Sequence, residues 1–309
     1  MKEKILKFKK LGLVLSAVVA TSAVLVLSGC SSNAASKDII TMKGDTVQVN
    51  DLYDRAKQFP NLPTNTLLQN ITFDKIFEKE SAIAKEATTK KVDAQFNSVK
   101  KQYGTQFDSA LQQQGLTEAN FKPYLKTQLL EQAAIEKDIA KTQYTEANLK
   151  TAWATYHPDV TAFVLSETSS DAANKAIAAN KADAAKFDKD NASSKVTFNS
   201  ASTTVSDDVK TAAYKLKNGE ISGVVTSSDA STGQTSYYVV KMIKTSDKGT
   251  DMNKYKSELK KVIKTQKMSD STYVSGVIGS YLKKYNVTVK ESAFSSLFSQ
   301  FTSQSSQSK

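Results

Sequence analysis

The side chains that most enzymes use for chemistry are scarce in this 309-residue sequence. There is one cysteine, Cys30, and one histidine, His157, so neither an intramolecular disulfide nor a metal site with several histidines can form. Arg55 is the only arginine among 42 basic residues, which leaves almost no bidentate arginine contact to phosphates or bases. We therefore expect no metal and no cofactor, and we expect function to rest on non-covalent apolar contacts.

Cys30 stands where a lipid could be attached. Lysines within 2–10 precede an uncharged run, 11–27, and this run ends in Leu27-Ser28-Gly29-Cys30. The layout is typical of a signal peptide, and its end resembles the bacterial lipobox, whose cysteine receives a diacylglyceryl group and becomes the mature N-terminus. A single transmembrane anchor is the alternative, but the run is short for a hydrocarbon layer about 30 Å thick. We expect a lipoprotein signal peptide over 1–29 and a lipidated tether over 30–38, with the chain held on the extracellular face of the cell membrane.

The charge balance is basic, with a formal net charge of +11. The lysines are scattered and arginine is nearly absent, so nucleic acid is not an expected partner. An excess of lysine fits attraction toward an anionic membrane or cell wall. Apolar residues make up 39% of the chain and charged residues 24%, which predicts a packed core and excludes wholesale disorder.

Hydrophobic periodicity predicts a mainly helical region over 39–157. It opens with a short hairpin, 39–49, which turns at Gly44. From Phe73 to about Lys150, apolar residues recur at helical spacing, and Thr117 and Thr145 each stand where a helix N-cap is expected.

The pattern changes after Tyr156 and changes back near residue 248. Strand-like segments at 160–165, 221–226 and 236–242, with an Ala/Lys-rich helix at 171–187, predict a mixed module over 158–247. Helical spacing returns over 252–285. We expect the C-terminal helices, 248–298, to pack with the N-terminal region, and the Ser/Gln-rich segment 299–309 to be a disordered tail. The predicted fold class is α+β, with the mixed module inserted into a helical domain.

A motif inside the mixed module resembles a known family. Residues 212–225 read Ala-Ala-Tyr-Lys-Leu-Lys-Asn-Gly-Glu-Ile-Ser-Gly-Val-Val, which is similar to the parvulin pattern Ala-Ala-Phe-x-Leu-x-x-Gly-Glu-[Ile/Val]-Ser-x-x-Val of peptidyl-prolyl cis-trans isomerases. Together with the lipobox and the helical regions, the whole chain resembles the PrsA-type foldase lipoproteins, which include the protease maturation lipoproteins of lactic bacteria. The resemblance implies a parvulin-like domain over 158–247 inside a helical chaperone domain. It also implies a lipid-anchored foldase that assists secreted polypeptides, unfolded or folding, after translocation.

The chain departs from the parvulin pattern at the residues that matter most for catalysis. Parvulins usually carry a histidine in the first strand and another in the last strand, and the matching positions here are Phe163 and Tyr238. The Met and Phe that commonly line the proline pocket match Val205 and Val209. The Gly-Gly-Asp-Leu-Gly segment of the family has no counterpart between Phe187 and Val205.

What remains is an expected apolar slot for peptide binding. Its predicted residues are Phe163, Leu165, Val205, Val209, Tyr214 and Tyr238. Rotation about an X–Pro bond needs no covalent nucleophile, because a pocket that binds the twisted amide more tightly lowers the barrier. Without the paired imidazoles we expect weak or absent isomerase activity, whereas holding a peptide needs apolar surface alone.

Two other functions stay open on the sequence. A solute-binding lipoprotein of a transporter would share the anchor and the length, but it should alternate strands and helices where 73–150 is helical. A catalytically inactive structural or adhesive surface lipoprotein is opposed by the foldase-like motif alone. The sequence also leaves open a homodimer.

Overall fold

The structure is a computed structural model that describes residues 35–228 and 235–302. The predicted signal peptide, Cys30 and residues 303–309 of the predicted tail lie outside the described residues. The described chain forms two compact units. We call residues 144–265 the module unit, and residues 35–143 with 266–302 the helical unit. No helix in the described ranges has the length and apolar character needed to cross a membrane.

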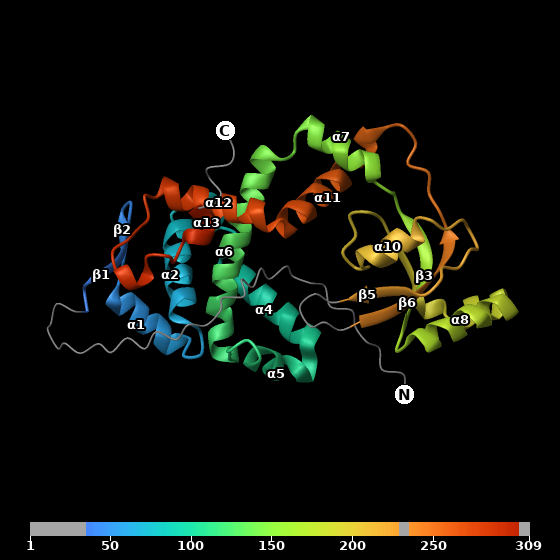
Figure 1. Cartoon of the computed structure of the whole chain (residues 1–309), viewed down its shortest axis with the longest axis horizontal. Helices are drawn as coiled ribbons and strands as arrows, with labels where there is room; N and C mark the ends of the chain where they lie inside the picture. Colours follow the sequence, from blue (N-terminus) through green and yellow to red (C-terminus); the bar gives the residue numbers. More distant parts are fainter. Residues whose placement is uncertain (1–34, 229–234, 303–309) are drawn as a thin grey trace. The chain divides into compact units, whose positions relative to one another are not determined.

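The helical unit is built on α6, the longest helix, with α2 and α4 packed beside it (Figure 1). Its helices are α1 (Val49–Gln58), α2 (Thr64–Glu78), α3 (Ser81–Ala84), α4 (Thr89–Tyr103), α5 (Phe107–Gln112), α6 (Glu118–Thr142), α12 (Ser271–Lys284) and α13 (Ser299–Thr302). Residues 73–150 contain no strand, which confirms the helical prediction and removes the support for a solute-binding protein. Within the predicted helical region, α1 begins at Val49 and α2 at Thr64, before the apolar periodicity that starts at Phe73.

Both predicted threonine caps are present. The Thr117 side chain accepts a hydrogen bond from the backbone N–H of Asn120, and the Thr145 side chain accepts one from Asn148. Each cap satisfies a backbone donor that the first helical turn would otherwise leave unpaired.

The predicted hairpin is also present, and it gains a third strand. β1 (Asp38–Met42) pairs antiparallel with β2 (Asp45–Gln48) around Gly44, whose φ of +73° favours glycine. β7 (Thr288–Val289), which follows α12, pairs with the other edge of β1. The sequence does not predict β7, because its two residues are recognisable only through pairing with a strand about 250 positions earlier in the chain.

The C-terminal segment corrects the predicted start of the disordered tail. Ser299–Thr302 form α13, and Phe301 is buried in the core that α2 and α12 share. The Phe301 ring lies edge-on to Phe73 with 5.7 Å between centroids, and Phe298 lies 6.2 Å from the same ring. Burial of these aromatic rings stabilises the end of the chain. It therefore orders residues 299–302, which the Ser/Gln-rich composition predicted to be disordered.

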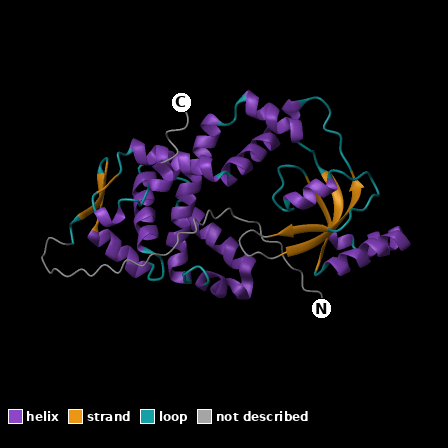
Figure 2. Cartoon of the chain, in the orientation of Figure 1, coloured by secondary structure: helices purple, strands orange, loops and turns teal. Residues whose placement is uncertain are grey.

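The module unit contains a four-stranded antiparallel sheet in the order β4-β3-β6-β5, with α8 and α10 packed on it (Figure 2). Its main elements are α7 (Glu146–Thr155), β3 (Val160–Glu167), α8 (Ser170–Ala182), α9 (Ala184–Asp190), β4 (Lys195–Phe198), α10 (Asp207–Ala213), β5 (Val225–Ser228), β6 (Thr235–Lys244) and most of α11 (Lys256–Ser269). The predicted helix 171–187 is split by Asp183, whose side chain caps α9. The predicted strand 221–226 is shorter, since Ile221 makes a single bridge to Lys241 before β5 begins.

Candidate functional site

The residues of the predicted peptide slot lie on two opposite faces of the module sheet. Successive side chains of a strand point to opposite faces, so the neighbours Phe163 and Val164 cannot share one. Phe163 and Leu165 belong to the core under α8 and α9, together with Phe187. Val205, Val209, Tyr214 and Tyr238 pack in the core on the α10 face. The prediction that all six line one slot is therefore wrong for Phe163 and Leu165.

The same alternation changes the comparison with the parvulin histidines. Phe163 lies opposite Lys241 in the ladder, whereas Tyr238 lies opposite Ser166. Lys241 is buried and pairs with Asp188 at 2.5 Å. Phe163, matched to the first histidine, thus faces this ion pair beneath α9. Tyr238, matched to the second histidine, lies on the other face of the sheet.

The four residues that share the α10 face form a core rather than an open groove. Val209 is completely buried and Val205 is 5% exposed. Tyr214 and Tyr238 are half-buried at its border. Any peptide that binds this face would contact the two tyrosines and would reach little of the two valines.

His157, the single imidazole of the chain, is exposed and stacks on Tyr214. The two ring centroids are 4.1 Å apart and the planes differ by 9°. The backbone N–H of His157 donates to the Ser200 hydroxyl at 2.8 Å. Desolvation of the ring, followed by the nearby Lys248 ammonium, lowers the pKa of His157. The stack with Tyr214 gives His157 a packing role that the sequence did not reveal.

A second candidate site, which no sequence motif indicates, is a cleft of about 1090 Å³ in the helical unit. We call it the helical cleft. It is lined by α1, α2, α4, α6 and the segment from Ala84 to Thr88. Its apolar lining is Ile71, Ala84, Ala87, Val92, Pro123 and Leu130. Its charged lining is Asp51, Asp54, Arg55, Asp74, Lys75, Glu78, Asp93, Lys122 and Lys126.

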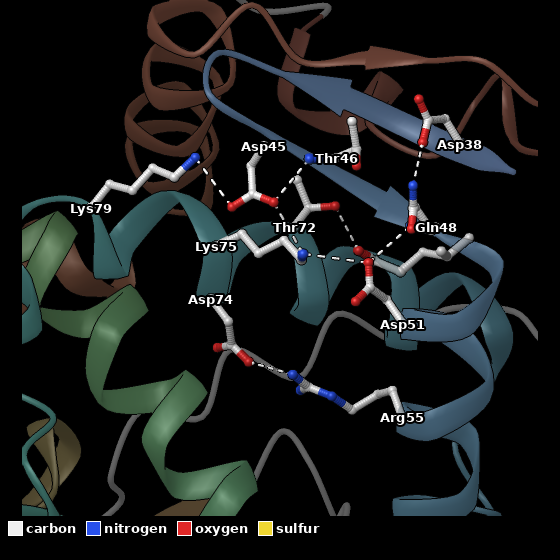
Figure 3. A network of polar contacts seen from close by, with 11 residues as sticks. Asp38, Asp45, Thr46, Gln48, Asp51, Arg55, Thr72, Asp74, Lys75 and Lys79 are labelled. Atoms are coloured by element: carbon white, nitrogen blue, oxygen red, sulfur yellow. Dashed lines mark hydrogen bonds and ion pairs between the residues drawn. The ribbon is translucent and has the colours of Figure 1, made fainter. Parts of the chain in front are cut away.

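A network of ion pairs fixes one wall of the helical cleft (Figure 3). The Arg55 guanidinium on α1 lies 2.8 Å from the Asp74 carboxylate on α2, and the Thr127 hydroxyl on α6 donates to Asp74 at 2.7 Å. Asp74 is poorly solvated, and this raises its pKa although Arg55 and Thr127 act in the opposite direction. This partly buried carboxylate therefore depends on these two partners, which join three helices.

The network continues to the hairpin through Lys75. Its ammonium lies 3.1 Å from Asp45 and 3.4 Å from Asp51 (Figure 3). Burial alone would lower the pKa of Lys75, but the hydrogen bonds and charges of Asp45 and Asp51 raise it. Lys79 adds a further contact to Asp45 at 3.2 Å. This wall is therefore a rigid frame of β2, α1 and α2.

Two further ion pairs among the lining residues, which we call the rim of the cleft, are weaker contacts. Lys126 on α6 pairs with Glu78 on α2 at 2.5 Å, and Lys122 pairs with Asp93 on α4 at 2.7 Å. All four side chains are nearly half exposed. Because such pairs contribute about 0–1 kcal/mol each, the rim can rearrange at little cost while the framed wall stays in place.

Glu131 on α6 makes the stability of the helical unit depend on pH. Burial and the Asp74 charge raise the pKa of Glu131 from 4.5 to about 8. In the unfolded chain the Glu131 carboxyl loses its proton near pH 4.5, whereas in the folded chain it keeps the proton up to about pH 8. The free energy of unfolding therefore falls as the pH rises from 4.5 through 8. A pKa difference of one between the folded and the unfolded chain corresponds to about 1.4 kcal/mol. We expect Glu131→Gln to raise the free energy of unfolding at pH 9 by ~2 kcal/mol and to change it little at pH 4.

Urea unfolding of the two proteins at a series of pH values measures this difference. Glu118→Gln, at an exposed position of the same helix, is the control and should give no comparable rise. If the difference in free energy of unfolding between the Glu131→Gln variant and the unchanged chain stays constant from pH 4 to pH 9, the raised pKa of Glu131 is contradicted.

Comparison with known proteins places these features in a family. The profile of the PPIC-type PPIASE domain matches residues 154–253. The chain is 67% identical over 307 residues to the foldase protein PrsA of Lactococcus lactis subsp. lactis (strain IL1403), covering 98% of this chain and 99% of that protein. It is 36% identical over 301 residues to the foldase protein PrsA of Streptococcus gordonii (strain Challis), covering 94% and 96%.

Solved structures agree with the sequence comparison. The crystal structure of the foldase protein PrsA from Lactococcus lactis matches with a TM-score of 0.70 and 68% identity, over 86% of this chain and 100% of that one. The structure of PrsA from Streptococcus pneumoniae (str. Canada MDR_19A) matches with a TM-score of 0.66 and 35% identity, over the same shares of the two chains. The predicted α+β fold class with a parvulin-like domain is confirmed.

Proposed function

Since this chain belongs to the PrsA family of foldases, we propose that it holds unfolded secreted polypeptides in the helical cleft while it is anchored to the outer face of the cell membrane through lipidated Cys30. The foldase character and the parvulin-type domain follow from the family. The use of the helical cleft, the lipid anchor and the weakness of prolyl isomerisation are the proposed parts.

The observation that carries the proposal is the combination of size, lining and rim in the helical cleft. A cleft of about 1090 Å³ can take a short polypeptide segment. Ile71 and Leu130 on its floor are 3% and 1% exposed, so this apolar surface becomes accessible only when neighbouring side chains move. The rim pairs of Lys122 and Lys126 can part at little cost, and an apolar client side chain would then replace them over the floor.

The module unit supports catalysis less well than holding. The positions matched to the two parvulin histidines carry Phe163 and Tyr238 and lie on opposite faces of the sheet. General acid–base groups act only within hydrogen-bond reach of the reacting atoms, and these two side chains do not form such a pair. We therefore assign foldase action chiefly to binding.

Filling the cleft tests the proposal. Ala84 on α3 lines the cleft and is half-buried, whereas Ala82 on the same helix is exposed and does not line it. We expect Ala84→Trp, in the chain that starts at residue 31, to weaken suppression of aggregation of an unfolded secreted enzyme about fivefold, the loss of about 1 kcal/mol of contact. Light scattering during dilution of the enzyme from denaturant measures the effect.

Ala82→Trp provides the matched control, because it adds the same ring to the same helix outside the cleft. It should suppress aggregation as the unchanged chain does. Equal activity of both tryptophan variants and the unchanged chain would show that clients bind elsewhere.

A further inference from the structure

One edge of the module sheet, formed by β5, pairs with no further strand of the described residues. β5 is the last strand in the order β4-β3-β6-β5, and it pairs with β6 from Val225↔Tyr238 to Ser228↔Thr235. Within the described ranges no strand pairs with its other edge. The outward N–H and C=O groups of such a strand form a template for a further strand.

The other sheet edges of the described chain carry features that discourage pairing. β4 begins with exposed Lys195, β2 begins with Asp45, and β7 is two residues long. Charged side chains and short length are common means by which proteins prevent an edge from taking up a foreign strand. By contrast, residues 221–228, which lead into and form β5, contain no charged residue and no proline.

Apolar side chains flank this edge on both faces of the sheet. Val225 packs with Tyr238 at the border of the α10-side core. Val224 and Tyr237 belong to the core on the α8 side. A strand added beside β5 would thus lie next to Val225 and the uncharged Thr226, Ser227 and Ser228, with Val224 just before them, and side chains on the same face of adjacent strands contribute to strand pairing.

We propose that β5 takes up an extended, uncharged segment of a client polypeptide as a fifth strand of the module sheet. The inference rests on the proposed function in one respect, that the partners are unfolded polypeptides. Recognition is by main-chain hydrogen bonds, which any sequence in extended conformation can make, with a preference for β-branched and aromatic side chains. The module unit would in this way hold clients without a proline pocket, and separately from the helical cleft.

A pair of synthetic peptides separates main-chain recognition from apolar contact. The first is an eight-residue peptide of alternating Thr and Val, flanked by neutral Gly-Ser pairs. The second is identical but N-methylated at each Thr and each Val, which removes the backbone donors along both edges and keeps the side chains. With the full chain in detergent, we expect the first peptide to bind at least about tenfold more tightly than the second, and to slow hydrogen exchange at residues 225–228.

Edge variants locate the site. Thr226→Lys with Ser228→Lys, both at exposed positions, should weaken binding of the first peptide about tenfold by placing charges beside the incoming strand. Thr197→Lys on β4 should leave its affinity unchanged. Equal binding of the two peptides, or unchanged binding by the β5 variant, would overturn the proposal. The helical cleft is tested by suppression of aggregation in Ala84→Trp, whereas β5 is tested by peptide affinity. The two proposals can therefore fail independently.

Discussion

Replacement of Gly279 by alanine is expected to lower the free energy of unfolding by ~3 kcal/mol, and the thermal midpoint by about 6 °C or more. Gly279 lies on α12 directly beneath the backbone of Phe301. A Cβ atom at this position would meet the Phe301 carbonyl oxygen well inside contact distance, and would lie 3.2 Å from the carbonyl carbon. Because these obstructing atoms belong to the backbone, α13 must move as a whole, and the rings of Phe298 and Phe301 lose part of their burial.

Gly276 offers a matched control three residues earlier in the same helix. A Cβ atom there meets nothing within 4 Å. Gly276→Ala should therefore be neutral or stabilise the chain by up to about 1 kcal/mol, since alanine is the better helix former. Calorimetry of both variants gives the comparison. Equal midpoints for Gly279→Ala and Gly276→Ala would mean that α13 is not packed on α12 as described.

The second large effect is expected at Cys30. Cys30→Ala removes the thiol that would carry the diacylglyceryl group, so incorporation of labelled palmitate should fall to background. Two acyl chains hold a protein stably on a membrane, whereas one is marginal. Without them the processed chain should leave the membrane fraction, or an unprocessed precursor of lower mobility should accumulate. Labelling followed by fractionation and electrophoresis distinguishes these forms.

Ser32→Ala, two residues beyond the lipobox, controls for changes in the tether and should keep both label and membrane retention. Palmitate incorporation that survives in Cys30→Ala would exclude Cys30 as the site of attachment. Membrane retention of an unlabelled chain with unchanged mobility would exclude lipid anchoring altogether.

The elements that the sequence predicted best are those defined by local signals. The caps at Thr117 and Thr145 and the turn at Gly44 follow from side-chain chemistry within a few residues. The strand that begins at Val160 was predicted from a short apolar run between breaking residues. In each case the information lies within one element, and tertiary packing reinforces it.

The faces of the module sheet could not be predicted in the same way. Phe163, Val164 and Leu165 are consecutive apolar residues in a strand with helices on both sides, so no polar alternation marks which side chain points where. The motif match aligns Phe163 with a parvulin histidine, but it does not show to which face of the sheet the Phe163 side chain points. The pairing with Lys241 supplied that orientation, because the register alternates side chains between the two cores.

The helical cleft and the C-terminal helix depend on contacts between distant segments. The cleft forms where α1, α2, α4 and α6 meet, and its wall depends on the pairing of Arg55 with Asp74, nineteen positions later. The C-terminal helix α13 contains one apolar residue, Phe301, among serine, glutamine and threonine, so no apolar periodicity marks it in the sequence. Only packing against Phe73 shows that Phe301 belongs to the core.

The rate of cis/trans exchange in a prolyl tetrapeptide tests most directly whether this foldase acts by holding rather than by catalysis. Uncatalysed exchange takes tens to hundreds of seconds, which exchange-resolved NMR follows with and without the chain that starts at residue 31. Since a positioned acid–base network accelerates proton-coupled reactions by about 10²–10⁴ and no second imidazole exists in the sequence, we predict a rate within about threefold of the uncatalysed one, unchanged in His157→Ala. Acceleration of about a hundredfold or more by the purified chain would contradict action by holding alone.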